Sequence, residues 1–333
     1  MVQRLKKNWT KWHHTFHKEI LNNENLIPNG YQLLVSVSGG QDSMALLTLL
    51  NEIKEQHNWS INVWHGDHKW HSKSEDFANK LKNYCFQNNI IFYLNSASQV
   101  NTSTEAKSRE WRYEKLYERA LEIFKKYKTE QKVIILTAHT STDNAETFFL
   151  NLSRGSDFAG LGGIHKKRLI NDKFLLVRPF LIFTRSETAS ICQDLKIPYW
   201  EDPTNADTNL KRNFIRHNVI NELEKIFPGC SNRINVFMDK LRNHQRERSE
   251  LCELAAESFV CEEGIKRSPL NTLTKQTRAT ILHYLLIKKC NTQISTKNIR
   301  CITEEIFKNN NGRKNLPNGI IIVWNKNFIN FTN

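Results

Sequence analysis

Between residues 32 and 199 the chain alternates short apolar runs with longer segments whose apolar residues recur at helical spacing. The short runs predict strands, because continuous apolar residues suit a strand that is buried on both faces. A helix is predicted after each strand, which is typical of a parallel sheet with right-handed crossovers. We therefore expect a doubly wound α/β fold with five parallel strands. The predicted strands are residues 33–37, 61–65, 90–94, 133–137 and 174–178.

The rest of the chain predicts a three-part organisation. The first part is a basic amphipathic helix, and the second is the α/β domain. Beyond a polar segment that reads as a linker or an ordered loop, apolar residues again follow helical spacing, and two short β runs come last. The third part is therefore predicted to be a smaller, mainly helical domain with short C-terminal strands. The predicted parts are residues 1–30, 31–215 and 216–333.

Composition limits the class of protein. Hydrophobic residues make up 39% of the 333 residues and charged residues 25%, which predicts a folded chain with a proper core. We find neither a run of 18 apolar residues nor a secretory signal, so no membrane association is expected. The net charge of +14 favours a polyanionic partner. Seven cysteines without a C-x-x-C pair suggest neither a disulfide framework nor a zinc site, and a reducing compartment fits.

The segment S-G-G-Q-D-S lies directly between the first predicted strand and its helix. Its two glycines permit a tight turn, and the free N–H groups at the start of the next helix favour an anion. The segment is neither a Walker A loop nor G-x-G-x-x-G. We interpret it as a phosphate-binding loop; a capped turn without a ligand is the alternative. The loop residues are Ser38, Gly39, Gly40, Gln41, Asp42 and Ser43.

A second group of polar residues follows the fourth predicted strand. In an open parallel sheet a ligand binds where the strand order reverses, and the order 3-2-1-4-5 puts that crevice between strands one and four. His139 and Asp143 should therefore face the loop, where His139 could orient a phosphate and Asp143 could hold Mg²⁺. Asp143 with Glu146 is alternatively a helix-capping arrangement. Asp67–His68, after the second strand, either contacts an adenine ring or forms an ordinary turn.

The string S-G-G-Q-D-S resembles the S-G-G-x-D-S signature of the PP-loop ATP pyrophosphatase superfamily. Members bind ATP at this loop, cleave it between the α- and β-phosphates, and transfer AMP to an oxygen of the substrate. The resemblance implies that Asp42 lies near magnesium or on the diphosphate side of the nucleotide.

Further motifs occur in the order found in the tRNA(Ile)-lysidine synthase family, which the chain resembles over nearly its whole length. Thr140 stands where the family has a second His, Thr142 where Asp or Asn is common, and Lys107 where a small or apolar residue is usual. The matching segments are E-A-K-S-R-E-W-R-Y (105–113), A-H-T-S-T-D-N-A-E-T (138–147), R-G-S (154–156) with G-L (160–161), R-P (178–179), D-P-T-N (202–205) and R-N-F-I-R (212–216).

The resemblance implies a reaction in two steps. ATP adenylylates O2 of the wobble cytidine in a CAU anticodon and releases diphosphate, and the ε-amine of free lysine then displaces AMP to form lysidine. Magnesium and cationic side chains would offset the charge on the departing diphosphate. The implied partners are tRNA(Ile) and L-lysine, with a homodimer possible in addition, and ATP and Mg²⁺ are the implied cofactors.

Site roles follow from the resemblance and from spacing. Two arginine pairs, three or four residues apart on helices, could clamp phosphates, although solvated surface charge is the usual fate of such residues. Two glutamates are candidates for the lysine amine. The predicted catalytic residues are Asp42, His139, Asp143, Arg112 and Arg212; the predicted substrate-binding residues are Glu105, Arg109, Glu146 and Arg216; and the predicted metal ligands are Asp42 and Asp143.

Three other functions compete with this hypothesis. A tRNA thiolase with the same loop needs a sulfur-carrying cysteine near the site, and the sequence predicts none beside the site motifs. A non-catalytic RNA-binding protein would not need the acidic residues, and a small-molecule synthetase fits the charge poorly. Heavy use of Lys, Asn and Ile, with phrases close to cyanobacterial members of the family, predicts a plastid-encoded protein of the chloroplast stroma. A bacterial cytoplasm is the alternative.

Overall fold

The structure, a computed structural model, describes residues 9–22, 26–69, 72–98, 104–127, 132–200, 210–290, 294–316 and 319–332. The chain splits into two compact units, Met1–Asp239 and Lys240–Asn333. This division lies beyond the predicted boundary at residue 215, because Arg216 and Asn235 bond to Glu146 and Asn144 of the first unit. Every helix in the described ranges is too short or too polar to cross a lipid bilayer.

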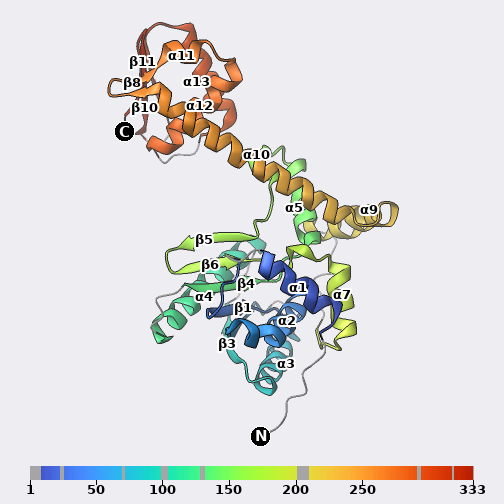
Figure 1. Ribbon diagram of the computed structural model, residues 1–333. Coiled ribbons are helices and arrows are strands. Elements are labelled where there is room, and N and C mark those ends of the chain that lie inside the picture. Colours follow the sequence, from blue (N-terminus) through green and yellow to red (C-terminus); the bar gives the residue numbers. More distant parts are fainter. Residues whose placement is uncertain are drawn as a thin grey trace. The chain divides into compact units, whose positions relative to one another are not determined.

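A six-stranded sheet forms the centre of the first unit, in the order β3-β2-β1-β4-β6-β5 (Figure 1). The neighbouring strands are parallel except β5, which is antiparallel to β6. The doubly wound fold is confirmed, but the predicted number of five strands was one too few. The missed strand β5 lies at the sheet edge and is mostly exposed, so it lacks an apolar run. The strands are β1 Gln32–Ser36, β2 Ser60–Asp67, β3 Ile91–Ser96, β4 Val133–Thr137, β5 Lys167–Asn171 and β6 Phe174–Val177.

Helices cover both faces of this sheet. Leu33 and Val35 of β1 pack with α1, α2, α3 and α7, whereas Leu34 packs with α4 on the opposite face. Successive strand residues point to opposite faces, so burial on both sides explains why the runs are continuously apolar. The helices of this unit are α1 Lys11–Asn22, α2 Gln41–His57, α3 Ser74–Gln87, α4 Glu105–Tyr127, α5 Ser141–Ser153, α6 Phe158–Leu161, η2 Pro179–Ile182, α7 Arg185–Asp194, α8 Lys211–Phe214, the π-type helix η4 Ile215–Ile220, α9 Asn221–Ile226 and the first part of α10 Cys230–Phe259.

The N-terminal helix α1 belongs to the first unit rather than forming a part of its own. Trp12, Phe16 and Ile20 are buried in the core that α2 shares, and Trp12 Nε1 donates to Asp194 at 2.7 Å. Residues 1–8, with the basic start of the predicted helix, lie outside the described residues.

His57, the last residue of α2, is buried beside α1. Its ring stacks on Trp59 with centroids 4.2 Å apart, and the ring of His17 lies 5.0 Å away. Its Nδ1 lies 2.7 Å from Oδ1 of Asn29. Burial lowers the pKa of His57, and the neighbouring His17 lowers it further. The imidazole is therefore neutral in the folded protein at neutral pH.

We predict that the free energy of unfolding decreases as pH falls below 6.5, the ordinary histidine value. Below that pH His57 binds a proton in the unfolded chain but stays neutral in the folded protein. Its contribution to the free energy of unfolding is therefore fully present above pH 6.5 and is lost as the pH falls from 6.5 toward the lower pKa of the folded state. In urea unfolding at about pH 5 and about pH 7.5, His57→Gln should show a shallower dependence than the parent. The exposed His244 provides the control variant His244→Gln. Equal slopes for parent and His57→Gln would disprove the assignment.

The second unit contains helices and an antiparallel sheet in the order β7-β8-β11-β10-β9. The helices and the last two strands agree with the predicted mainly helical part with short C-terminal strands. Strands β7 to β9 were not predicted, because none of them contains an apolar run of more than two residues. The elements after α10 are β7 Val260–Cys261, β8 Gly264–Lys266, α11 Arg267–Asn271, α12 Lys275–Cys290, α13 Thr296–Lys308, β9 Gly312–Asn315, β10 Ile321–Trp324 and β11 Phe328–Thr332.

Candidate active site

The loop from Ser38 to Ser43 joins β1 to α2 and is closed by its own serines. The Ser43 hydroxyl donates to the Gly40 carbonyl at 2.9 Å and accepts from the Ser38 N–H at 3.2 Å. Gly39 has φ +90°, a conformation that favours glycine. Gly40 is the N-cap of α2 and brings no side chain to that position. The first N–H groups of α2 thus remain directed at the loop, as an anion site requires.

Trp200 covers this loop from a distant part of the sequence. Its backbone N–H donates to the Gly39 carbonyl at 3.0 Å. A Cβ at Gly39 would lie only 3.1 Å from Cε3 of the Trp200 ring. Sequence reasoning missed this contact, because nothing in the local pattern around Trp200 indicates where its ring packs.

Asp42, in the first turn of α2, is held by α7. Its Oδ2 accepts from Nη1 of Arg185 at 3.2 Å, and its Oδ1 accepts from the hydroxyl of Thr188. Burial raises the pKa of Asp42, Arg185 opposes this rise, and the negative charge of Asp143 adds to it. The structure therefore brings Asp42 and Asp143 close enough to interact. Neither Arg185 nor Thr188 was predicted as a site residue.

The other side of the site follows β4. Ser36 of β1 pairs with Thr137 of β4, so the carboxyl ends of both strands meet at the expected reversal of strand order. His139 lies just beyond, with its Nδ1 2.9 Å from the Thr137 hydroxyl oxygen. Burial lowers the pKa of His139. The charge of Asp143 raises this pKa, and the charges of nearby arginines lower it further. His139 is therefore a neutral imidazole, able to donate one hydrogen bond and to accept another.

Asp143 both caps α5 and binds an arginine. Its Oδ2 accepts from the backbone N–H and the hydroxyl of Thr140 at 2.8 and 2.9 Å. Its Oδ1 accepts from Nη2 of Arg212 at 2.9 Å. Burial alone would raise the pKa of Asp143, but Arg212, the Thr140 N–H and Arg216 together lower it. The capping role and an ionised carboxylate in the site thus coexist in one side chain.

Glu146 is fully buried and lies between the two arginines of R-N-F-I-R. Its carboxylate accepts from Nε of Arg212 at 2.7 Å, and from Nε and Nη2 of Arg216 at 2.5 and 3.1 Å. The arginine pair is thus engaged by carboxylates of α5 in this structure. These contacts join α5 to α8 and η4.

The remaining predicted residues are more scattered. Arg109 is exposed on α4 with its guanidinium 5.2 Å from the Tyr113 ring, and its charge contributes to the lowered pKa of His139. Arg112 is half-buried on the same helix. Asp67 is buried, and its Oδ1 accepts from the N–H of Lys69 at 2.8 Å, as in an ordinary turn. The side chain of Glu105 and residues 202–205 lie outside what the structure describes.

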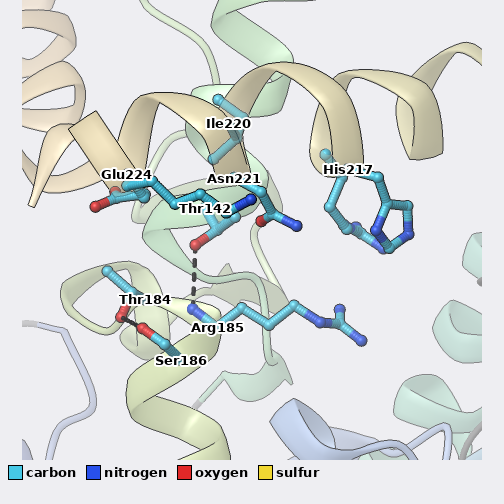
Figure 2. A pocket seen from close by; sticks show the side chains of 10 residues that line it. Thr142, Thr184, Arg185, Ser186, His217, Ile220, Asn221 and Glu224 are labelled. Atoms are coloured by element: carbon cyan, nitrogen blue, oxygen red, sulfur yellow. Dashed lines mark hydrogen bonds between the residues drawn. The ribbon is translucent and has the colours of Figure 1, made fainter. Parts of the chain in front are cut away.

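A pocket of about 440 Å³ opens between the first turns of α5 and α7 on one side and η4 and α9 on the other. Figure 2 shows the hydroxyl of Thr142 facing the backbone N–H of Arg185, a bond of 3.1 Å. Arg185 and Arg216 line the pocket and also bond to Asp42 and Asp143. The pocket therefore lies beside the arginines that bond to the two carboxylates of the site.

The strand order, the glycine loop and a match of residues 12–223 to the PP-loop domain define a PP-loop protein. Among solved structures, the fold resembles the U34-tRNA thiolase NcsA from Methanococcus maripaludis (TM-score 0.56, 17% identity, 70% of this chain and 79% of that one). Within the PP-loop proteins, a tRNA(Ile)-lysidine synthase that is 52% identical over 97% of this chain shows that the chain belongs to the tRNA(Ile)-lysidine synthase family.

Two relatives illustrate this membership. The tRNA(Ile)-lysidine synthase of Prochlorococcus marinus subsp. pastoris is 52% identical over 326 residues, which cover 97% of this chain and 96% of the relative. The chloroplastic tRNA(Ile)-lysidine synthase of Pyropia yezoensis is 38% identical over 215 residues, 63% of each chain.

Proposed function

We propose that this chain joins lysine to the wobble cytidine of CAU-anticodon tRNA(Ile) in an ATP-dependent ligation that forms a C–N bond. The observation that carries this proposal is the meeting of the loop, Asp42 and the His139–Asp143 segment at the β1–β4 crevice. It is supported by relatives of that name that match nearly the whole chain. The net charge of +14 suits a tRNA substrate.

The side chains fit nucleotide activation. We propose that the loop amides bind the β- and γ-phosphates and that neutral His139 donates a hydrogen bond near the α-phosphate. Asp42 and Asp143 supply carboxylate oxygens, which suit Mg²⁺ together with phosphate oxygens. In the described ranges we find no set of three His, Cys, Asp or Glu that could hold a metal by itself, so phosphate oxygens would complete the coordination. Bound Mg²⁺ would neutralise charge on the leaving diphosphate.

We revise the predicted role of Glu146. Because both its oxygens accept from arginines and none of it is exposed, we propose that it positions Arg212 and Arg216 and does not touch the lysine amine. Arg109 and Arg112 keep their proposed role in contacting phosphates, and Glu105 keeps its proposed role toward lysine.

The pocket beside Asp143 is a candidate site for free lysine. Its volume of about 440 Å³ is in the range of small-molecule sites. Arg185, Arg216 and Lys225 could meet a carboxylate. Glu224, also in the lining, already accepts from backbone N–H groups at the start of α10.

A thiolase function is less well supported, although one sequence expectation needs correction. Cys192 does lie beside the loop, with its Sγ 3.5 Å from the carbonyl oxygen of Gln41. Burial raises the pKa of Cys192 to about 12, and the charge of Asp42 adds to this. A thiol that remains protonated is a poor sulfur carrier.

The decisive experiment incubates the protein with ATP, labelled lysine and tRNA(Ile) bearing CAU. We expect label in the tRNA only when ATP is present and the wobble position is cytidine. The control tRNA carries uridine at that position. Labelling of the control tRNA, or none of either tRNA, would refute the proposed function.

The proposed cellular compartment rests on the organisms and compartments of the relatives. They include cyanobacterial and chloroplastic proteins, so a plastid or a bacterial cytoplasm fits. The plastid stroma remains a proposal. The cyanobacterial relative matches more of this chain than the chloroplastic one does, which favours a bacterial cytoplasm. A homodimer also remains a proposal, which sedimentation would test.

Gly39→Ala should weaken ATP binding by about tenfold. Alanine resists the φ of +90°, at a cost of about 1–2 kcal/mol, and its Cβ would press on Trp200. Calorimetric titration with ATP measures the change. Gly30→Ala is a matched control, since Gly30 also has positive φ, at +81°, but open space around its Cβ position. Unchanged ATP affinity in Gly39→Ala would show that the loop tolerates a side chain.

A further inference from the structure

The two carboxylates of the site lie on separate crossovers of the sheet. Asp42 follows β1 on α2, and Asp143 follows β4 on α5. Like charges at close range repel each other. Their spacing therefore depends on contacts that join α2 to α5, and the start of α7 makes such contacts with both helices.

On the α2 side, α7 reaches Asp42 through two side chains. Thr188 is fully buried, and its hydroxyl accepts from Nε2 of Gln41 at 2.9 Å and donates to Oδ1 of Asp42. The hydroxyl has a single hydrogen, and the Arg185 carbonyl oxygen 2.9 Å away is its other acceptor. That carbonyl already accepts from Nε2 of Gln41 at 2.7 Å, and a carboxylate is the stronger acceptor, so the hydrogen is directed at Asp42. Arg185 donates to the other oxygen, Oδ2, at 3.2 Å.

Toward α5, the same turn bonds to the backbone and to a side chain. The Ser141 N–H donates to the Phe183 carbonyl at 2.8 Å, and the Arg185 N–H donates to the Thr142 hydroxyl at 3.1 Å. A capping box between Thr184 and Glu187 fixes the start of α7. Thr142 directly precedes Asp143, so the turn is tied to both carboxylates.

We propose that the first turn of α7 is a clamp that sets the spacing of Asp42 and Asp143, with Thr188 and Arg185 as positioning residues for the divalent cation. This inference rests on the proposed function, because it takes the two carboxylates as cation ligands. Thr188 fixes the rotation of the Asp42 carboxylate by holding one of its oxygens. The ligand oxygens are then preorganised before the nucleotide and cation arrive.

The test compares Thr188→Val, which keeps the shape and removes the hydroxyl, with Thr188→Ser, which keeps the hydroxyl. The probe is Mn²⁺, titrated by electron paramagnetic resonance with the non-hydrolysable analogue α,β-methylene-ATP. We expect Thr188→Val to raise the half-saturating Mn²⁺ concentration by about tenfold, since lost support of a metal ligand weakens affinity 10–100-fold. Thr188→Ser should stay within about twofold of the parent.

Thr48→Val provides the matched control. Thr48 is a buried threonine of α2 whose hydroxyl lies 3.0 Å from that of Tyr84, away from Asp42. We expect Thr48→Val to lower Tm, as Thr188→Val does, and to leave Mn²⁺ binding unchanged. If Thr188→Val fails to fold, Arg185→Gln replaces it in the test, because the Arg185 side chain is 36% exposed. We expect Arg185→Gln to raise the half-saturating Mn²⁺ concentration by about threefold.

Each of the following results would overturn the clamp: parental Mn²⁺ binding in Thr188→Val, equal loss of Mn²⁺ binding in Thr48→Val, or equal loss in Thr188→Ser. Absence of Mn²⁺ binding by the parent would overturn it as well. Lysine transfer separates the two proposals. If the parent transfers lysine and Thr188→Val binds Mn²⁺ normally, the clamp alone is refuted. If the parent transfers no lysine and Thr188→Val binds Mn²⁺ more weakly than the parent, the proposed function alone is refuted.

Discussion

We expect Asp42→Asn and Asp143→Asn each to lower the rate of lysine transfer to tRNA by about a thousandfold, because in the proposed function each carboxylate faces the reacting phosphates and their cation. Single-turnover transfer of labelled lysine measures this effect. Both side chains converge on the crevice from different helices, so losing either one breaks the pair.

Asparagine is the better replacement because Asp143 also has a structural role. Alanine would remove the acceptor for the Thr140 N–H and hydroxyl and weaken the start of α5. Asp76→Asn is a suitable control, since Asp76 is an exposed residue of α3 paired with Lys80. Transfer at the parental rate by either site variant would show that the carboxylate is not part of the catalytic machinery.

Glu146→Ala should lower the free energy of unfolding of the first unit by about 3–5 kcal/mol, the usual cost of breaking a buried ion pair. The variant leaves the guanidinium groups of Arg212 and Arg216 without their shared buried partner. Arg216 is only 12% exposed, so water cannot replace the lost carboxylate. Urea unfolding followed by tryptophan fluorescence reports mainly on this unit, because Trp324 is the single tryptophan beyond residue 239.

The matched control for this loss is an exposed ion pair. Glu122 on α4 pairs with Arg119 and is 61% exposed, so Glu122→Ala should change stability by less than about 1 kcal/mol. A loss in Glu146→Ala as small as in Glu122→Ala would mean that the buried network contributes little to folding.

The sequence by itself determined the sheet and the position of the loop. Four strands, β1, β2, β4 and β6, are largely buried on both faces, so their continuous apolar runs were visible without a structure. Strand β4 has the predicted bounds, Val133–Thr137. The edge strand β5 was missed because exposed, polar residues carry no such signal.

Only the tertiary structure decided which partner each charged side chain has. The spacing of Glu146 fits a cap, a surface charge or a substrate contact equally well, and its burial between two arginines became clear in the fold. The contacts of Thr188 with Asp42 and of Trp200 with Gly39 join residues far apart in the chain. Local spacing governs backbone conformation and periodic burial, whereas such contacts depend on how distant elements pack.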